Sequence, residues 1–138
     1  MPALLIETGT ERGMTAIVDG EAILFHAILP LGYHNSRYLL PEIEKGLQQL
    51  NLAVKNLQYI ACGQGPGSYT GIRVGATVAK SLAFACKLPL IGISTLQTFV
   101  PDKEGAFAVL IDAKIGGVYM IKGSRKGCLL YTSPSPRD

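Results

Sequence analysis

The sequence predicts an α/β fold built on one mixed β-sheet, followed by the start of a second, similar unit. Three observations predict it. Short apolar runs and longer helical periods alternate before residue 100, a hairpin signal stands at Asp19-Gly20, and the first pair of strands is repeated near the end of the chain. The 138 residues, 48% of them hydrophobic, suffice for one compact domain but not for two full ones.

The first half of the fold is predicted as three strands and a helix. The apolar run Ala3 to Thr8 is typical of a buried strand, and Met14 to Leu29 of two strands joined at Asp19-Gly20. The helix extends from Asn35 to Leu50, because its apolar residues recur at helical spacing: Leu39, Leu40, Ile43, Leu47 and Leu50.

The second half alternates strands and helices. Leu57 to Gly63 and Leu88 to Ser94 are predicted strands. Between them, Ser68 is placed to cap a long helix from Tyr69 to about Cys86, and a short helix follows from Thr95 to Phe99. The order β-β-β-α-β-α-β matches the ribonuclease-H-like fold, the unit that is duplicated in the actin and sugar-kinase superfamily.

The segment AFAVLIDAKIGGVYMIKG repeats the design of ALLIETGTERGMTAIVDG: an apolar strand, an acid, a short turn containing glycine, and a second strand. Glu7 and Asp112 occupy equivalent places in the two copies. We therefore expect a first lobe over residues 1–104 and the first hairpin of a second lobe over residues 105–127.

The last eleven residues, CLLYTSPSPRD, break this composition with two Ser-Pro pairs. A flexible terminus is one interpretation. The other is that residues 128–138 are not native, because a transposon-type sequencing adaptor read in frame translates to this peptide. The native protein would then continue past Gly127.

Composition narrows the class of protein. The net charge of +3 is mild for a nucleic-acid-binding protein, so any contact with nucleic acid is expected to be shared with a partner. Three cysteines without metal-type spacing favour reduced thiols. With neither a signal peptide nor an apolar run of about 20 residues, we expect a cytoplasmic protein without membrane contact.

The glycine-rich stretch GQGPGSYTGIRVG, Gly63 to Gly75, offers two interpretations. Glycine loops before helices can bind phosphate through backbone N–H groups. This one lacks the Gly-Lys-Ser/Thr ending of a P-loop and the spacing of a dinucleotide fingerprint. Close packing is therefore favoured, with anion contact kept as an alternative at Glu7, Thr8, Gly65, Gly67, Ser68 and Asp112.

Four small residues line one face of the long helix at a spacing of four: Gly71, Gly75, Ala79 and Ala83. Each glycine inside a helix costs on the order of 1 kcal/mol relative to alanine, so close approach of another element is expected. That element is either a partner's helix or the protein's own sheet. In the first case the apolar residues of the opposite face, Ile72, Val78, Leu82 and Phe84, would cover the sheet.

Catalytic and metal-binding patterns are not found. His26 and His34 form no His-x-x-x-His pair, and Ser68, Ser94 and Cys62 have no base in sequence range. Glu7 ends the first strand where actin-like ATPases carry a metal-directing aspartate. Its extra methylene disfavours an octahedral magnesium site, and a structural role in accepting turn N–H groups is the alternative. We expect no catalytic residue and no metal site.

Together these pieces resemble one family. GQGPGSYTGIRVGATVAKSLA resembles the signature of the TsaB (YeaZ) family, and three shorter pieces agree in order: LLIETGT, IGISTLQT and DAKIGGVY. The resemblance covers Ala3 to about Lys122. Two features depart from the family's pattern, namely Glu7 in place of aspartate and the short second lobe.

The resemblance implies a role in making N6-threonylcarbamoyladenosine beside the anticodon of ANN-decoding tRNAs. In this family the chemistry belongs to a larger paralogue, TsaD, which holds a metal. TsaB supports TsaD without catalysis, an ATPase called TsaE joins the complex, and ATP and magnesium are used by the complex. TsaB alone would bind no cofactor and would contact tRNA only through the complex.

The family also forms homodimers through the helices that bind TsaD. Carried onto this chain, the interface would comprise Tyr38, Leu39, Glu42, Ile43, Leu47, Gly71, Gly75, Ala79 and Ala83. The alternative function is an actin-like ATPase or phosphotransferase, with Glu7 and Asp112 around a metal and the Gly63 to Gly71 loop near phosphate.

Overall fold

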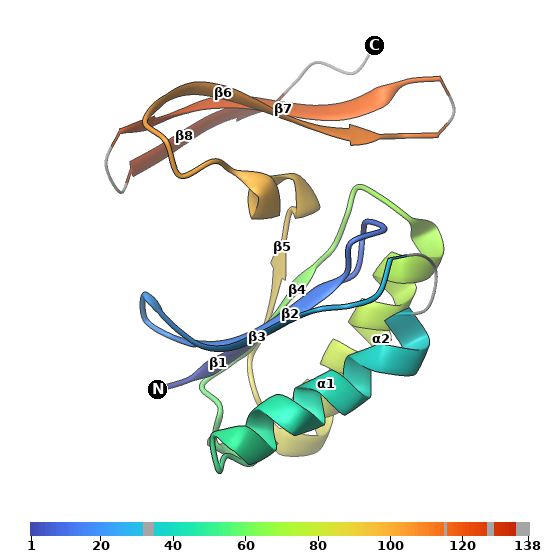
Figure 1. The fold of residues 1–138 in the computed structure, drawn as a ribbon, viewed down its shortest axis with the longest axis vertical. Helices are drawn as coiled ribbons and strands as arrows, with labels where there is room; N and C mark the ends of the chain where they lie inside the picture. The colour runs from blue at the N-terminus through green and yellow to red at the C-terminus, as the bar shows by residue number, and fades with distance from the viewer. Residues whose placement is uncertain (32–34, 115, 127–128, 135–138) are drawn as a thin grey trace.

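The computed structural model describes residues 1–31, 35–114, 116–126 and 129–134. Two β-sheets follow one another along the chain, and two helices cover one face of the first sheet (Figure 1). The arrangement is the mixed α/β fold that the order of elements predicted, with a second sheet after it.

The first sheet has the strand order β3-β2-β1-β4-β5. The strands β1 (Ala3–Glu7), β2 (Met14–Asp19) and β3 (Ala22–Ile28) form an antiparallel meander, which confirms the predicted hairpin. The remaining strands, β4 (Ile60–Gly63) and β5 (Leu90–Ile93), pair in parallel with β1 and with each other. Parallel pairing requires crossovers, and the two helices provide them.

The fourth strand starts later than its apolar run predicts. A short 3₁₀ helix, η1 (Val54–Asn56), precedes it, and the N–H of Leu57 closes that turn on the carbonyl of Val54. Leu57 is therefore buried without being part of the strand. An apolar run shows burial more reliably than it shows where a strand begins.

Both helices, α1 (Asn35–Gln49) and α2 (Tyr69–Cys86), lie on the same face of the sheet (Figure 1). Ser68 caps α2 as predicted, because its Oγ accepts a hydrogen bond from the N–H of Gly71 at 3.2 Å. No helix among the described residues is long and apolar enough to cross a membrane. The core between helices and sheet consists of Leu4, Ile6, Ile17, Leu29, Leu39, Ile43, Leu47, Leu57, Ile60, Cys62, Ala79 and Ala83.

A short 3₁₀ helix, η2 (Thr95–Phe99), leads from β5 to the second sheet on the side away from α1 and α2 (Figure 1). This sheet contains β6 (Gly105–Asp112), β7 (Val118–Lys126) and β8 (Leu129–Pro134) in that order. The pair β6-β7 is the predicted hairpin, in register from Gly105 opposite Arg125 to Asp112 opposite Val118.

The third strand, β8, was not predicted. It lies in the tail that the sequence analysis set apart from the fold, and it pairs antiparallel with β7 from Lys126 opposite Leu129 to Ile121 opposite Pro134. That residues 128–138 derive from an adaptor stays a prediction, because the open edge of a strand can pair with any extended segment that reaches it.

Candidate functional site

The glycine-rich loop packs against the turn that follows β1. A Cβ at Gly63 would overlap the Glu7 carboxylate, and one at Gly67 would overlap the carbonyl oxygen of Gly9. The N–H of Ser68 donates to the same Gly9 oxygen at 2.7 Å. Gly67 lets the two turns meet backbone to backbone, and Gly63 leaves room for the Glu7 side chain. Close packing, the favoured interpretation, therefore accounts for both glycines.

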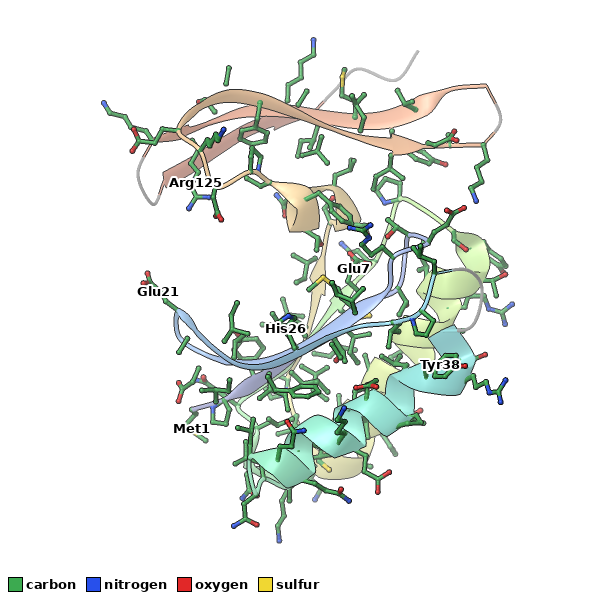
Figure 2. All side chains as sticks on the ribbon, viewed as in Figure 1. Met1, Glu7, Glu21, His26, Tyr38 and Arg125 are labelled. Carbon is green, nitrogen blue, oxygen red and sulfur yellow. The ribbon has the colours of Figure 1, made fainter. Side chains whose placement is uncertain are left out.

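Glu7 lies at the end of β1, toward η2 (Figure 2), and is only 5% exposed. Its Oε2 accepts the N–H of Gly9 and its Oε1 accepts the hydroxyl of Thr98, each at 3.0 Å. Both carboxylate oxygens are thus engaged by protein donors. This is the structural alternative that the sequence left open for Glu7, and it compensates for the burial of a carboxylate.

Much of the donor capacity of the loop is used inside the protein. The N–H of Gly65 donates to the Thr95 hydroxyl at 3.1 Å, that of Ser68 to Gly9, and that of Gly71 to the Ser68 hydroxyl. A phosphate cradle needs such groups aimed at the ligand. Anion binding by this loop stays a prediction. These three N–H groups already donate to acceptors within the protein.

A cleft of about 580 Å³ lies between the two sheets. Of the residues proposed for anion contact, Gly67, Ser68 and Asp112 line it. Glu7 and Thr8 are buried outside the lining, and the Glu7–Asp112 pair of the ATPase alternative is not brought together around this cleft. The Nζ of Lys114 closes one side by pairing with Glu11 at 2.9 Å.

Within the described part of the chain, no three His, Cys, Asp or Glu side chains gather where they could hold a metal ion. His34 lies outside the described residues, and His26 is exposed on β3. Burial, and after it the charge of Glu7, raise the pKa of the Cys62 thiol to about 11. A thiol with such a pKa is protonated at neutral pH and is a poor nucleophile.

The structure corrects the role that we expected for the small-residue face of α2. The residues expected at a partner interface, Gly71, Gly75, Ala79 and Ala83, are the buried residues of this helix and pack on its own sheet. A Cβ at Gly71 would overlap the Thr8 carbonyl oxygen, and one at Gly75 the Thr8 hydroxyl. Phe84, which would have covered the sheet only if the small-residue face bound a partner, is 90% exposed. The small residues let α2 approach β1 closely, which larger side chains would prevent.

The predicted interface on α1 is corrected in the same way. Leu39, Ile43 and Leu47 are core residues under 10% exposed. Only Tyr38 and Glu42 of the predicted set retain part of their surface. A partner can therefore contact the exposed positions of α1. It cannot contact the apolar stripe, on which the prediction of the helix was based, because that stripe is buried in the core.

The outer surface of the helical layer carries a groove of about 380 Å³ that sequence reasoning missed. Ser36 of α1 and five residues of α2 line it: Thr70, Arg73, Val74, Thr77 and Val78. The signal was available in the sequence, because positions 70, 73, 74, 77 and 78 share one helix face. The sequence analysis instead assigned the partner interface to the opposite face of α2, because that face carries the two glycines.

A scan against protein families matches residues 32–129 to the family described as TsaD, tRNA N6-adenosine threonylcarbamoyltransferase. The chain is 36% identical over 130 residues to the tRNA threonylcarbamoyladenosine biosynthesis protein TsaB of Escherichia coli, covering 91% of this chain and 56% of that protein. The TsaB protein of Bacillus subtilis is 30% identical over 122 residues, 86% of this chain and 53% of the relative.

The chain belongs to the TsaB (YeaZ) family. A solved structure described as YeaZ from Pseudomonas aeruginosa superimposes with a TM-score of 0.83 at 25% identity, covering 97% of this chain and 65% of that one. A second Pseudomonas aeruginosa structure, described as similar to peptidase YEAZ, gives 0.85 at 24% identity, covering 97% and 64%, and supports the fold. The chain spans about half the length of the curated TsaB relatives.

Proposed function

We propose that this chain acts in the biosynthesis of N6-threonylcarbamoyladenosine on tRNA, as a non-catalytic subunit that binds and supports a TsaD-like catalytic subunit. The modified base is the adenosine beside the anticodon of ANN-decoding tRNAs. Curated relatives at 30–38% identity are named as TsaB proteins of this pathway, which supports the assignment.

The burial and the hydrogen bonds of Glu7 support the proposal that this subunit is not catalytic. In an actin-like ATPase, the acid that ends the first strand faces the metal-bound phosphate. In this chain the Glu7 carboxylate is buried, accepts hydrogen bonds from Gly9 and Thr98, and does not line the cleft. A carboxylate that is buried, holds two internal donors and does not face the cleft is placed as a structural acceptor and not as a group that orients a metal in the cleft.

The partner surface is proposed on the outer side of α1 and α2, where Tyr38, Glu42, Tyr69, Arg73 and Thr77 are fully or partly exposed. The small-residue face is no longer a candidate, because it is covered by β1. A bulky residue at Gly75 would disturb the fold itself and would be a poor probe of binding.

Further participants belong to the proposed complex. ATP, magnesium and the metal held by the TsaD-like subunit would be used there, with this chain binding none of them alone. A TsaE-like ATPase and tRNA would meet the chain in the complex. A homodimer through the same outer helices would compete with the TsaD-like subunit. We place this assembly in the cytoplasm, away from membranes.

Reconstitution tests the proposal. The TsaD-like subunit from the same genome is supplied with threonylcarbamoyl-adenylate and an ANN-decoding tRNA, with and without this chain. Modified nucleoside is quantified by mass spectrometry after digestion of the tRNA. We expect binding of the two proteins and an increased yield with the chain present. Neither binding nor an increase, with an active TsaD-like subunit, would overturn the proposal.

The cleft supports a second candidate, an ATPase or phosphotransferase of the actin-like class. Its volume of about 580 Å³ is sufficient for a small ligand, and Ser68, Asp112 and Lys114 line it. Calorimetric titration of the isolated chain with magnesium-ATP distinguishes the candidates. Saturable binding that weakens in Lys114→Ala would favour the second, whereas the first predicts no binding.

A further inference from the structure

Two turns line the cleft from opposite sheets, and both are closed in the same way. In the turn after β1, the N–H of Gly9 donates to the Glu7 carboxylate at 3.0 Å. In the turn after β6, the N–H of Lys114 donates to the Asp112 carboxylate at 2.8 Å. Each acid accepts the N–H of the second residue after it, a local bond that is typical of turns. The acids in equivalent places of the repeat therefore close equivalent turns.

Lys114 stands where the first turn has Gly9, in a backbone conformation that suits glycine better. Its φ is +61°, in the left-handed region that a residue with a Cβ atom seldom adopts. The turn fixes this conformation, because the N–H of Ala113 also donates to the carbonyl of Gly117 at 2.9 Å. Backbone strain of this kind persists where the surrounding structure imposes it, and it directs attention to what the side chain does.

The Lys114 side chain reaches the other turn. Its Nζ lies 2.9 Å from the Oε1 of Glu11, 103 residues earlier in the chain. Glu11 also belongs to a closed turn, in which the Thr10 hydroxyl donates to the Arg12 carbonyl and accepts the Arg12 N–H, each at 3.3 Å. Figure 1 shows the two turns on the same side of the molecule. The ion pair therefore joins two closed turns that belong to different sheets.

The other links between the sheets lie at η2 and just after it. Thr98 of η2 donates to Glu7 of the first sheet, whereas Arg125 of β7 donates to the carbonyl of Pro101 and the carboxylate of Asp102. Since η2 also contacts β6 and β7, the two sheets meet at this segment. A change in the angle between the sheets can then occur around η2 without disrupting the pairing of strands in either sheet.

We propose that the Glu11–Lys114 ion pair is a clasp that holds the cleft between the two sheets closed and lets it open when the pair is broken. The side chains are 61% and 53% exposed, so the pair is weak and screened by salt. A weak link suits a clasp, because a modest change in the surroundings can release it. The inference goes beyond the proposed function and does not depend on it.

Hydroxyl-radical footprinting with mass spectrometry tests the clasp, because Phe99 and Tyr119 line the cleft and both react with the radical. Glu11→Gln removes one charge at nearly constant size. It should raise both oxidation rates, by up to roughly twofold, since these side chains are 40% and 39% exposed in the closed cleft. Tyr69 on α2 is outside the cleft and should react at an unchanged rate.

Asp19→Asn is the matched control. It breaks an ion pair of similar exposure, between Asp19 and the N-terminal amino group of Met1 at 3.1 Å, which does not span the cleft. The oxidation rates of Phe99 and Tyr119 should therefore stay at the wild-type values. Added salt should raise both rates in wild type and change them little in Glu11→Gln, where the pair is already broken.

Two further variants separate the clasp from the stability of the fold. Lys114→Gly removes the side chain but relieves the left-handed backbone, so it should open the cleft as Glu11→Gln does without lowering the thermal unfolding temperature. The double variant Glu11→Lys with Lys114→Glu exchanges the two charges and should return both oxidation rates to the wild-type values. Circular dichroism verifies that each variant is folded.

The inference is overturned if Phe99 and Tyr119 react at wild-type rates in both Glu11→Gln and Lys114→Gly. It is also overturned if the rates rise equally in Asp19→Asn or at Tyr69, because the change is then a general loosening. A charge exchange that leaves the rates raised would show that pairing of these charges does not close the cleft. None of these results bears on the proposed function, which has its own test.

Discussion

The hydroxyl of Thr98 donates a hydrogen bond of 3.0 Å to the Oε1 of Glu7, across 91 residues of sequence. The contact joins the end of β1 to η2, the segment that connects the first sheet to the second. Because Glu7 is buried, this bond and the one from Gly9 make the carboxylate part of the framework between the sheets.

Removal of the Glu7 carboxylate should destabilise the fold. Glu7→Ala leaves the buried N–H of Gly9 and the partly buried hydroxyl of Thr98 without their acceptor, and an unsatisfied buried donor costs about 1–3 kcal/mol. We expect a loss of about 2–4 kcal/mol in urea unfolding. Glu21→Ala, at the exposed hairpin turn labelled in Figure 2, is the control and should change stability by less than about 0.5 kcal/mol.

Gly75 should not accept even one methyl group. Gly75→Ala would raise intrinsic helix propensity by about 1 kcal/mol, but its Cβ would overlap the Thr8 hydroxyl. Overpacking of this kind costs about 1–3 kcal/mol, so we expect net destabilisation by thermal unfolding. Gly117→Ala, where a Cβ would meet open space, is the matched control. Equal stability of the two variants would contradict the close packing of α2 on β1.

Opposite faces of α2 should respond differently to substitution. Phe84 is 90% exposed, so Phe84→Ser should leave the free energy of unfolding within about 0.5 kcal/mol of wild type. Ala79 is fully buried, and Ala79→Leu should destabilise the protein by about 1–3 kcal/mol. The opposite ranking in chemical denaturation would show that Phe84, and not the small-residue face, covers the sheet.

The Cys62 thiol should be slow to react. Its pKa is raised to about 11, so at pH 8 iodoacetamide should modify the less buried Cys86 first. Peptide mapping after timed labelling measures this order. Equal labelling of the two cysteines in the folded protein would argue against the burial of Cys62.

The same pKa shift makes stability depend on pH. The folded state holds the thiol proton more tightly than the unfolded state, whose pKa is near 9. Stability from this group is therefore complete below pH 9 and decreases as the pH rises from 9 toward 11. Cys62→Ala should show a smaller decrease than wild type over that range in denaturant titrations.

The sequence by itself determined the order of the strands β1 to β7 and of the helices α1 and α2, the hairpin at Asp19-Gly20 and the capping of α2 by Ser68. These features depend on local chemistry: alternating apolar residues, turn residues and a side chain that reaches its own helix. The family was also recognisable in the glycine-rich signature, because its spacing reflects a particular close packing of two turns.

Tertiary structure alone decided which face of α2 is inside, and it decided what Glu7 does. Periodicity shows that Gly71 and Gly75 share a face, but a helix with small residues on one side and larger apolar ones on the other can pack either way. Only the position of Thr8 beneath that face resolves the choice. Likewise, Glu7 meets Thr98 because the fold brings distant segments together, and no local pattern encodes such a contact.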